Sequence, residues 1–175
     1  MLKFTVAISC LLFLLAGCQN NPQHHTEDID STLATIPEAI SQLDVTPLSG
    51  YFVKNTIQVK DSLTFWVIDN QQTFDSLFGY AKTMNNTIIA PDLGTNVVVA
   101  VTMPATSYNT QISLLSATLN TNTNNAELHF SAAGNPAPSS STIVPLWLGS
   151  FPKSGPMEIK LYIGNHLAMK VHEKE

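Results

Sequence analysis

Arginine is absent from this 175-residue chain, and all eight of its basic residues are lysines. Arginine is the side chain best suited to bidentate recognition of phosphate and carboxylate groups, and the lysines form no basic cluster. The formal net charge is −5, and only 12% of the residues are charged. These features exclude nucleic acid as a partner, because proteins that bind it carry clustered Lys and Arg.

Cysteine is also scarce, since the chain contains only Cys10 and Cys18, both near its start. The rest of the sequence therefore offers no disulfide, no cysteine metal site and no cysteine nucleophile. The G-x-S-x-G, H-E-x-x-H and P-loop motifs are missing as well, so nucleophilic, zinc-protease and nucleotide chemistry lack their usual residues. We predict a protein that is not an enzyme and that uses no cofactor.

The first seventeen residues have the pattern of an export signal. Lys3 precedes an apolar run over residues 4–15, which is too short to cross a bilayer because a span takes about 20 residues. The run ends in LAGC at residues 15–18, which resembles the lipobox of bacterial lipoproteins at all four positions. The resemblance implies cleavage before Cys18, a diacylglycerol on its thiol and acylation of its new amino group.

This lipobox resemblance also indicates where the protein resides. Several acyl chains together give stable membrane anchoring, whereas a single chain gives only marginal binding. Lipoproteins retained at the inner membrane tend to carry Asp after the modified cysteine, and here that residue is Gln19. We therefore expect an outer-membrane lipid anchor in the cell envelope, with the face of the membrane left open. The alternative is an ordinary signal peptide with an incidental cysteine.

Residues 18–47 are predicted to be a lipidated cysteine and flexible tether, because they combine prolines and acidic residues with little apolar periodicity. Pro37 suits the first turn of a short helix at residues 37–43. His24 and His25 lie near three acidic residues, but ordering a flexible segment around a metal ion costs entropy, so we interpret them as solvated. Residues 48–175 are predicted to form one β-rich domain.

Short alternating or β-branched runs predict strands, at residues 51–59, 63–68, 96–103, 110–119, 126–132, 142–151, 158–163 and 167–172. The run at residues 96–103 is apolar throughout, which is typical of a central strand. The tip NTNTNN and the pair Gly164-Asn165 predict two hairpins. Residues 134–141 are predicted to be a loop, and Pro145 indicates an edge or a bulge.

One amphipathic helix is predicted after a cap at Asp69 or Asn70. Its apolar face combines residues at i, i+3, i+4 and i+7, namely Phe74, Leu77, Phe78 and Ala81. The fold class that follows is α+β, a mainly antiparallel β-sheet (roll) with this short helix packed on it. A β-sandwich is the alternative.

The order of these elements over residues 60–155 resembles the C-terminal domain of the protease-complex subunit PrcB. The residues that carry the resemblance are TFDSLF at 73–78, VVVAV at 97–101 and FPK at 151–153. The chain departs from that family in its Asn/Thr-rich hairpin tip and in TMP at 102–104. The resemblance implies a lipoprotein that accompanies an exported protease and supplies no catalytic residue.

The stretch PLWLGSFPKSGP at residues 145–156 is the candidate partner-binding segment. Trp147 and Phe151 lie among prolines and glycines with Lys153 beside them, and rigid aromatic side chains on a loop are typical of protein-binding hot spots. The alternative is that both rings fill the end of the core. Ser31 and Ser62 follow aspartates, in tripeptides that resemble the D-[ST]-x sequence O-glycosylated in some bacterial envelopes.

Two functions remain open from the sequence. The first is a membrane-anchored, non-catalytic module that binds or assembles with an envelope protein, for which an exported protease is one candidate. Such a module is expected to expose an apolar patch near Trp147. The second is a small-ligand or glycan-binding lipoprotein, which is expected to carry a pocket lined by aromatic rings with Asn and Thr groups.

Overall fold

The computed structural model describes residues 39–81 and 87–173. The predictions for Cys18, for Ser31 and for the two tether histidines fall outside these residues. Among the described residues, no helix is both long and apolar enough to cross a bilayer.

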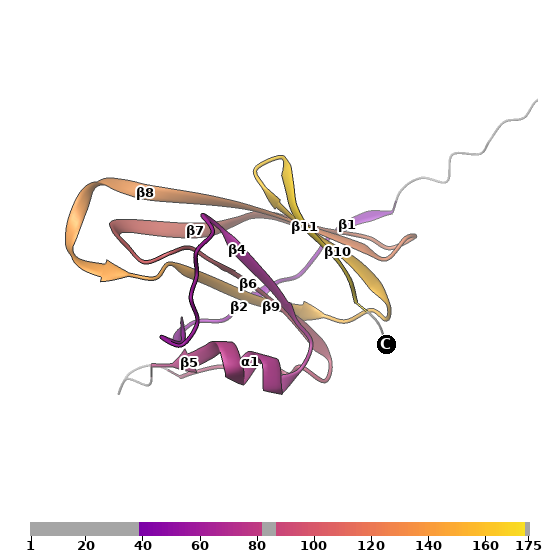
Figure 1. Cartoon of the computed structure of the whole chain (residues 1–175). Helices are drawn as coiled ribbons and strands as arrows, with labels where there is room; N and C mark the ends of the chain where they lie inside the picture. Colours follow the sequence, from indigo (N-terminus) through magenta and orange to yellow (C-terminus); the bar gives the residue numbers. More distant parts are fainter. Residues whose placement is uncertain (1–38, 82–86, 174–175) are drawn as a thin grey trace, which may run out of the picture. The chain divides into compact units, whose positions relative to one another are not determined.

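The strands of the described residues form three sheets (Figure 1). Sheet A has the order β1-β7-β8-β10-β11, sheet B has the order β2-β9-β6-β4, and β3 pairs with β5. The elements are β1 (Ile40–Gln42), β2 (Thr46–Pro47), β3 (Tyr51–Val53), β4 (Thr64–Ile68), α1 (Gln71–Leu77), β5 (Phe78–Tyr80), β6 (Asn96–Thr102), β7 (Thr106–Asn120), β8 (Asn125–Ile143), β9 (Leu146–Pro152), β10 (Met157–Ile163) and β11 (His166–Glu173).

Sheet B is covered on both faces, and this explains the continuous apolar run of β6. Successive side chains of a strand point to opposite faces. Val97, Val99 and Val101 pack in one core cluster with residues of sheet A. Val98 and Ala100 pack in a second cluster with Phe74, Phe78 and other residues around α1. The prediction of a central strand here is confirmed, since β6 lies between β4 and β9.

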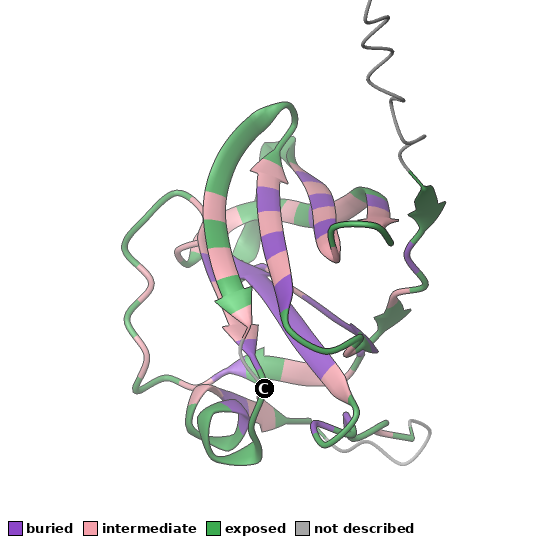
Figure 2. Ribbon diagram, turned by 90° about the vertical axis from the view of Figure 1, so that its right-hand side faces the viewer, coloured by how far each residue is buried: buried purple, intermediate pink, exposed green. Residues whose placement is uncertain are grey.

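The predicted α+β class is confirmed, because the described residues form mainly antiparallel strands with one short helix packed on sheet B. The face of sheet B that does not carry the helix packs on sheet A. The domain therefore also has the face-to-face packing of two sheets that is typical of the alternative, a β-sandwich. The strands β8 and β10 are parallel. After β8 the chain leaves sheet A, passes through sheet B as β9, and returns to sheet A as β10. Figure 2 shows the alternation of buried and partly exposed residues along β10.

The helix α1 begins as predicted but ends early. Asn70 caps it, accepting a hydrogen bond at 2.8 Å from the backbone N–H of Thr73. Leu77 is its last residue, and Phe78 already has extended backbone angles and begins β5. The predicted continuation to Ala81 is therefore wrong. The ring of Phe78 reaches the same core from a strand, and Gly79 is a poor helix former.

The boundary between tether and domain also needs correction. β1 pairs with the end of β7 and β2 pairs with β9, so residues 40–47 belong to the folded sheets. Leu43 and Leu48 are buried in the two core clusters. The helix predicted at residues 37–43 is wrong in its described part, where Ile40–Gln42 form the strand β1. These strands are only two or three residues long, and the apolar periodicity of so short a segment is not detectable.

The hairpin with the tip NTNTNN is confirmed, but it is much longer than predicted. β8 pairs with β10 only over Asn125–Phe130, whereas its pairing with β7 continues to Ile143. Residues 106–113 of β7 and 131–143 of β8 thus form a two-stranded extension, called the arm below, in which β8 bends around the start of β7 (Figure 1). The loop predicted at residues 134–141 is wrong, because these residues are paired strand with shifted register.

Candidate binding surface

The strand predicted at residues 142–151 is confirmed as β9 (Leu146–Pro152), so the loop assumed for Trp147 and Phe151 is wrong. Most of the candidate partner-binding segment forms β9, which pairs with β2 on one side and with β6 on the other. Phe151 lies opposite Val97 and is only 1% exposed. The partner-binding role predicted for Phe151 does not fit this position, because a ring enclosed by the core offers no surface to a second protein.

Lys153 is used inside the molecule. Its amino group donates hydrogen bonds to the carbonyl oxygens of Asp69 at 3.2 Å and Leu93 at 3.0 Å. Its backbone N–H donates to the carbonyl of Thr95 at 2.9 Å. Lys153 therefore fastens the start of α1 and the turn before β6 to the end of β9, and its charge is not presented to a partner.

The structure brings together two carboxyl groups that are far apart in the sequence, those of Asp69 and Glu173. A hydrogen bond from the Asn70 amide lowers the pKa of Asp69, and Lys153 contributes to that lowering. Burial raises the pKa of Glu173, and the neighbouring Asp69 charge adds to the rise. The pair joins the start of α1 to the last strand, and neither carboxyl lines the hollows described below.

Trp147 lies half-buried on β9, on the face of sheet B that packs against sheet A. Its ring contacts Phe130 of β8 edge to face, with 4.9 Å between the ring centroids. The indole N–H has no acceptor among the described residues, where no side-chain N or O is both buried and unpaired. The N–H therefore reaches solvent and is available to a bound molecule.

Two neighbouring hollows extend from Trp147 along the arm. The first has a volume of about 500 Å³, and its lining includes Asn109, Gln111, Ile143, Val144 and Trp147. The second has a volume of about 440 Å³, and its lining includes Ser107, Asn109, Pro138, Ser139 and Ile143. Because Asn109 and Ile143 border both hollows, the two form one elongated groove.

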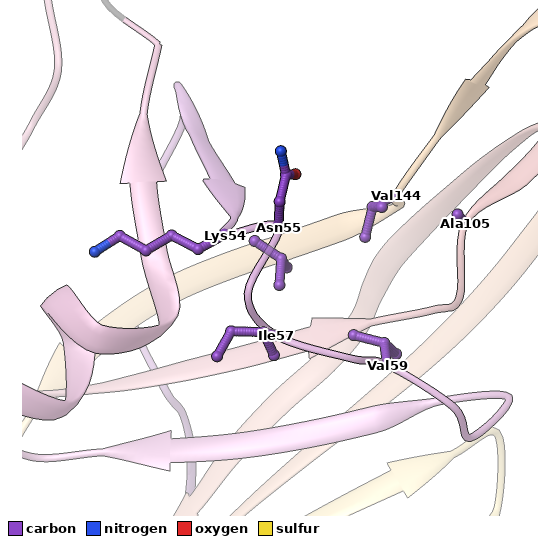
Figure 3. A pocket seen from close by; sticks show the side chains of 7 residues that line it. Lys54, Asn55, Ile57, Val59, Ala105 and Val144 are labelled. Carbon is purple, nitrogen blue, oxygen red and sulfur yellow. The ribbon is translucent and has the colours of Figure 1, made fainter.

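A third hollow adjoins this groove on the other side of Val144. It has a volume of about 220 Å³, and its lining combines the apolar side chains of Ile57, Val59, Ala105 and Val144 with the amide of Asn55 (Figure 3). The amino group of Lys54 points away from these side chains and donates a hydrogen bond to the carbonyl of Asp75. The groove is therefore extended by a recess that carries no free charge.

Exposed apolar side chains gather along the groove. Ile143, which lines both hollows, is 37% exposed, and Val144, which lines the first, is 43% exposed. Single exposed apolar residues are common, but a contiguous group beside a groove marks an interaction site. Ile143 and Val144 are thus two adjacent exposed apolar side chains just before Trp147. Both residues were predicted to begin the strand at residues 142–151, whereas Ile143 ends β8 and Val144 lies between β8 and β9.

The remaining candidate positions lie on the surface. Ser62 is exposed in a bend before β4, so its hydroxyl is accessible for the proposed O-glycosylation. His166 and His172 both lie on β11 and are exposed. His172 lies across from Glu158, with 3.4 Å between its Nε2 and a carboxylate oxygen.

Gly149 is essential for the position of Trp147. A Cβ atom at this glycine would lie 2.5 Å from the indole Cη2 and 2.8 Å from Cγ1 of Val45. We expect Gly149→Ala to lower the free energy of unfolding by about 1–3 kcal/mol, the usual cost of overpacking a core. Urea denaturation followed by tryptophan fluorescence measures this loss. Gly134→Ala is the control, since its nearest neighbour is the Thr110 hydroxyl at 3.2 Å; an equal effect of both variants would contradict the assignment.

Comparisons with protein-family models, curated proteins and solved structures found no match for this chain.

Proposed function

We propose that this chain is an exported, lipid-anchored protein of the outer membrane that binds another envelope protein and catalyses no reaction. The observation that carries the binding function is the groove beside Trp147, with the exposed side chains of Ile143 and Val144 along it. The membrane anchor rests on the LAGC sequence that ends at Cys18.

The form of the groove favours an extended protein segment as its occupant. Asn109 and Gln111 lie two residues apart on β7, which matches the two-residue repeat of a strand laid along the groove. Apolar side chains of such a segment would contact Ile143 and Val144, and its backbone carbonyls would accept hydrogen bonds from the amides and from the Trp147 indole. In peptide recognition of this kind, the backbone hydrogen bonds supply affinity and the side-chain contacts supply specificity.

The hollow at Trp147 also has the aromatic ring and the Asn and Thr groups that were expected for a glycan site. It shares Asn109 and Ile143 with the second hollow, and two hollows in a row favour a long chain over a small enclosed ligand. The resemblance to the PrcB domain makes an exported protease the first class of partner to test.

The test is site-specific photo-crosslinking in cells, with a photoreactive amino acid replacing Asn109 in the lipidated protein. We expect one reproducible envelope protein to be crosslinked. The additional change Val144→Ser should reduce its yield at least tenfold, because burial of an aliphatic side chain contributes about 1.5–3 kcal/mol and tenfold corresponds to about 1.4 kcal/mol.

Leu115 provides the matched control, because it is 60% exposed on β7 and lines none of the three hollows described above. The photoreactive amino acid at Leu115 should capture little of the same partner, and Leu115→Ser should leave the yield from Asn109 unchanged. The proposal is contradicted if Asn109 captures no reproducible protein, or if Val144→Ser and Leu115→Ser behave alike.

A further inference from the structure

A different hollow lies on the solvent-facing side of sheet A. It has a volume of about 190 Å³, and its lining includes Ile40, Thr118, Thr123, Asn125, Glu127 and Lys160. Pockets for drug-sized ligands enclose about 300–1,000 Å³. This hollow is therefore suited to one small polar unit.

The register of sheet A places these side chains together. Thr118 lies directly opposite Glu127, and Glu127 lies directly opposite Lys160. Their neighbours along the strands, such as Ala117 and Leu128, are buried against sheet B. Because side chains alternate between the two faces of a strand, the polar residues all point outward.

Several polar groups of the hollow are unpaired. The Asn125 amide and the hydroxyls of Thr118 and Thr123 have no hydrogen-bond partner among the described residues. Ile40, which is 59% exposed, adds one apolar wall. The hollow thus combines free donors and acceptors with a single apolar contact.

The hairpin tip at the rim of the hollow is held in place. The Asn124 side chain donates hydrogen bonds to the carbonyls of Pro156 at 2.6 Å and Ser154 at 3.1 Å. The Ser154 hydroxyl donates in return to the Asn124 amide oxygen at 2.6 Å. The Asn120 side-chain oxygen accepts the backbone N–H of Thr123 at 3.2 Å. A fixed rim reduces the ordering cost of binding a ligand.

The charges next to the hollow balance. Lys160 lies 3.0 Å from a Glu127 oxygen and 3.5 Å from a Glu158 oxygen, and Lys170 forms an ion pair with Glu158 at 2.6 Å. Two carboxylates thus face two ammonium groups. This balance favours neither an anionic nor a cationic ligand, while the charged groups remain strong hydrogen-bond partners.

We propose that this hollow binds one unit of a neutral, polyhydroxylated ligand, that is, a saccharide. Hydroxyl groups of a sugar both donate and accept hydrogen bonds, which matches Asn125, Thr118 and the Glu127–Lys160 pair. The C–H groups of the sugar ring would contact Ile40. The site is separate from the protein-binding groove, so it does not rest on the function proposed above.

The test is saturation-transfer NMR on the full lipidated protein in dodecylphosphocholine micelles, a detergent without a sugar headgroup. The probes are the neutral saccharides chitotetraose, cellotetraose and maltotetraose. We expect saturable binding of at least one probe in the millimolar range or tighter. Asn125→Ala should weaken that binding at least tenfold, and Glu127→Gln should weaken it as well.

Asn109→Ala is the matched control, because it removes an amide from the groove at Trp147 and leaves the hollow on sheet A unchanged. Unchanged binding in this variant supports the proposal. Three results would overturn it: no probe binds up to about 10 mM, Asn125→Ala binds as tightly as the unaltered protein, or Asn109→Ala is the variant that loses binding. Neither side-chain amide makes a hydrogen bond within the described residues, so both variants should fold.

Discussion

Phe130→Ala is expected to lower the free energy of unfolding by about 3–5 kcal/mol, the usual cost of truncating a fully buried aromatic side chain. Phe130 is 0% exposed. Its ring contacts Phe65 of β4 and Trp147 of β9, at centroid distances of 6.1 and 4.9 Å. Phe130 itself belongs to sheet A and both partners belong to sheet B, so the truncation opens a cavity between the two sheets.

Thermal unfolding followed by circular dichroism measures this effect, and the expected fall in the unfolding midpoint is on the order of 10–20 °C. Leu115→Ala is the control, because an exposed side chain on β7 should change the stability by less than about 0.5 kcal/mol. Phe130→Leu should lie between the two, since it keeps part of the volume. A similar midpoint for Phe130→Ala and Leu115→Ala would contradict the packing of sheet A on sheet B.

Cys18→Ser is expected to abolish lipid attachment and to release the protein from the membrane. Of the two cysteines, Cys18 alone occupies the last position of the LAGC sequence. The thiolate is the nucleophile in cysteine alkylation, and a serine hydroxyl does not replace it. The measurement is incorporation of radiolabelled palmitate, together with the distribution of the protein between membrane and soluble fractions.

Cys10→Ser is the matched control, because Cys10 lies within the apolar run of the export signal and is expected to leave with it. This variant should incorporate palmitate normally and remain in the membrane fraction. Labelling that persists in Cys18→Ser, or that disappears in Cys10→Ser, would refute the lipoprotein assignment. The protein-binding proposal would survive either result, since the groove at Trp147 does not depend on the anchor.

The local signals in the sequence predicted the elements whose cause is local. The β-branched run at residues 96–103 became β6, and Asn70 capped the helix where its side chain can reach the N–H of Thr73. Gly164 occupies the left-handed region at φ 56° in the final hairpin turn. Each of these features depends on residues close together in the chain, so composition and spacing were sufficient.

The wrong predictions concern segments whose structure depends on residues far away in the sequence. β1 is only three residues long, and its strand conformation comes from pairing with β7 about eighty residues later. The segment from Pro145 contains residues that usually break strands. The loop assumed there for the aromatic rings is wrong, and the strand predicted at residues 142–151 forms as β9, because β6 and β2 supply its hydrogen bonds and the Trp147 ring covers Gly149.

The candidate binding surface was likewise predicted only in part from the sequence. Residue type alone singled out Trp147, because an aromatic among prolines and glycines is distinctive, and it also singled out Phe151, which the fold then buried. The exposure of Ile143 and Val144 follows from the pairing of the arm, in which β8 loses β10 as a neighbour after Phe130. No pattern among neighbouring residues predicts that the pairing of β8 with β10 ends at Phe130.

The sequence by itself therefore determined the class of the domain and its central strand β6, narrowed the helix cap to Asp69 or Asn70, and predicted the lipid anchor at Cys18. Only the tertiary structure decided which apolar side chains remain accessible and which polar side chains of sheet A gather around one hollow. The physical reason is that burial and pairing depend on contacts between segments far apart in the chain. Propensity and periodicity report only on neighbours along it.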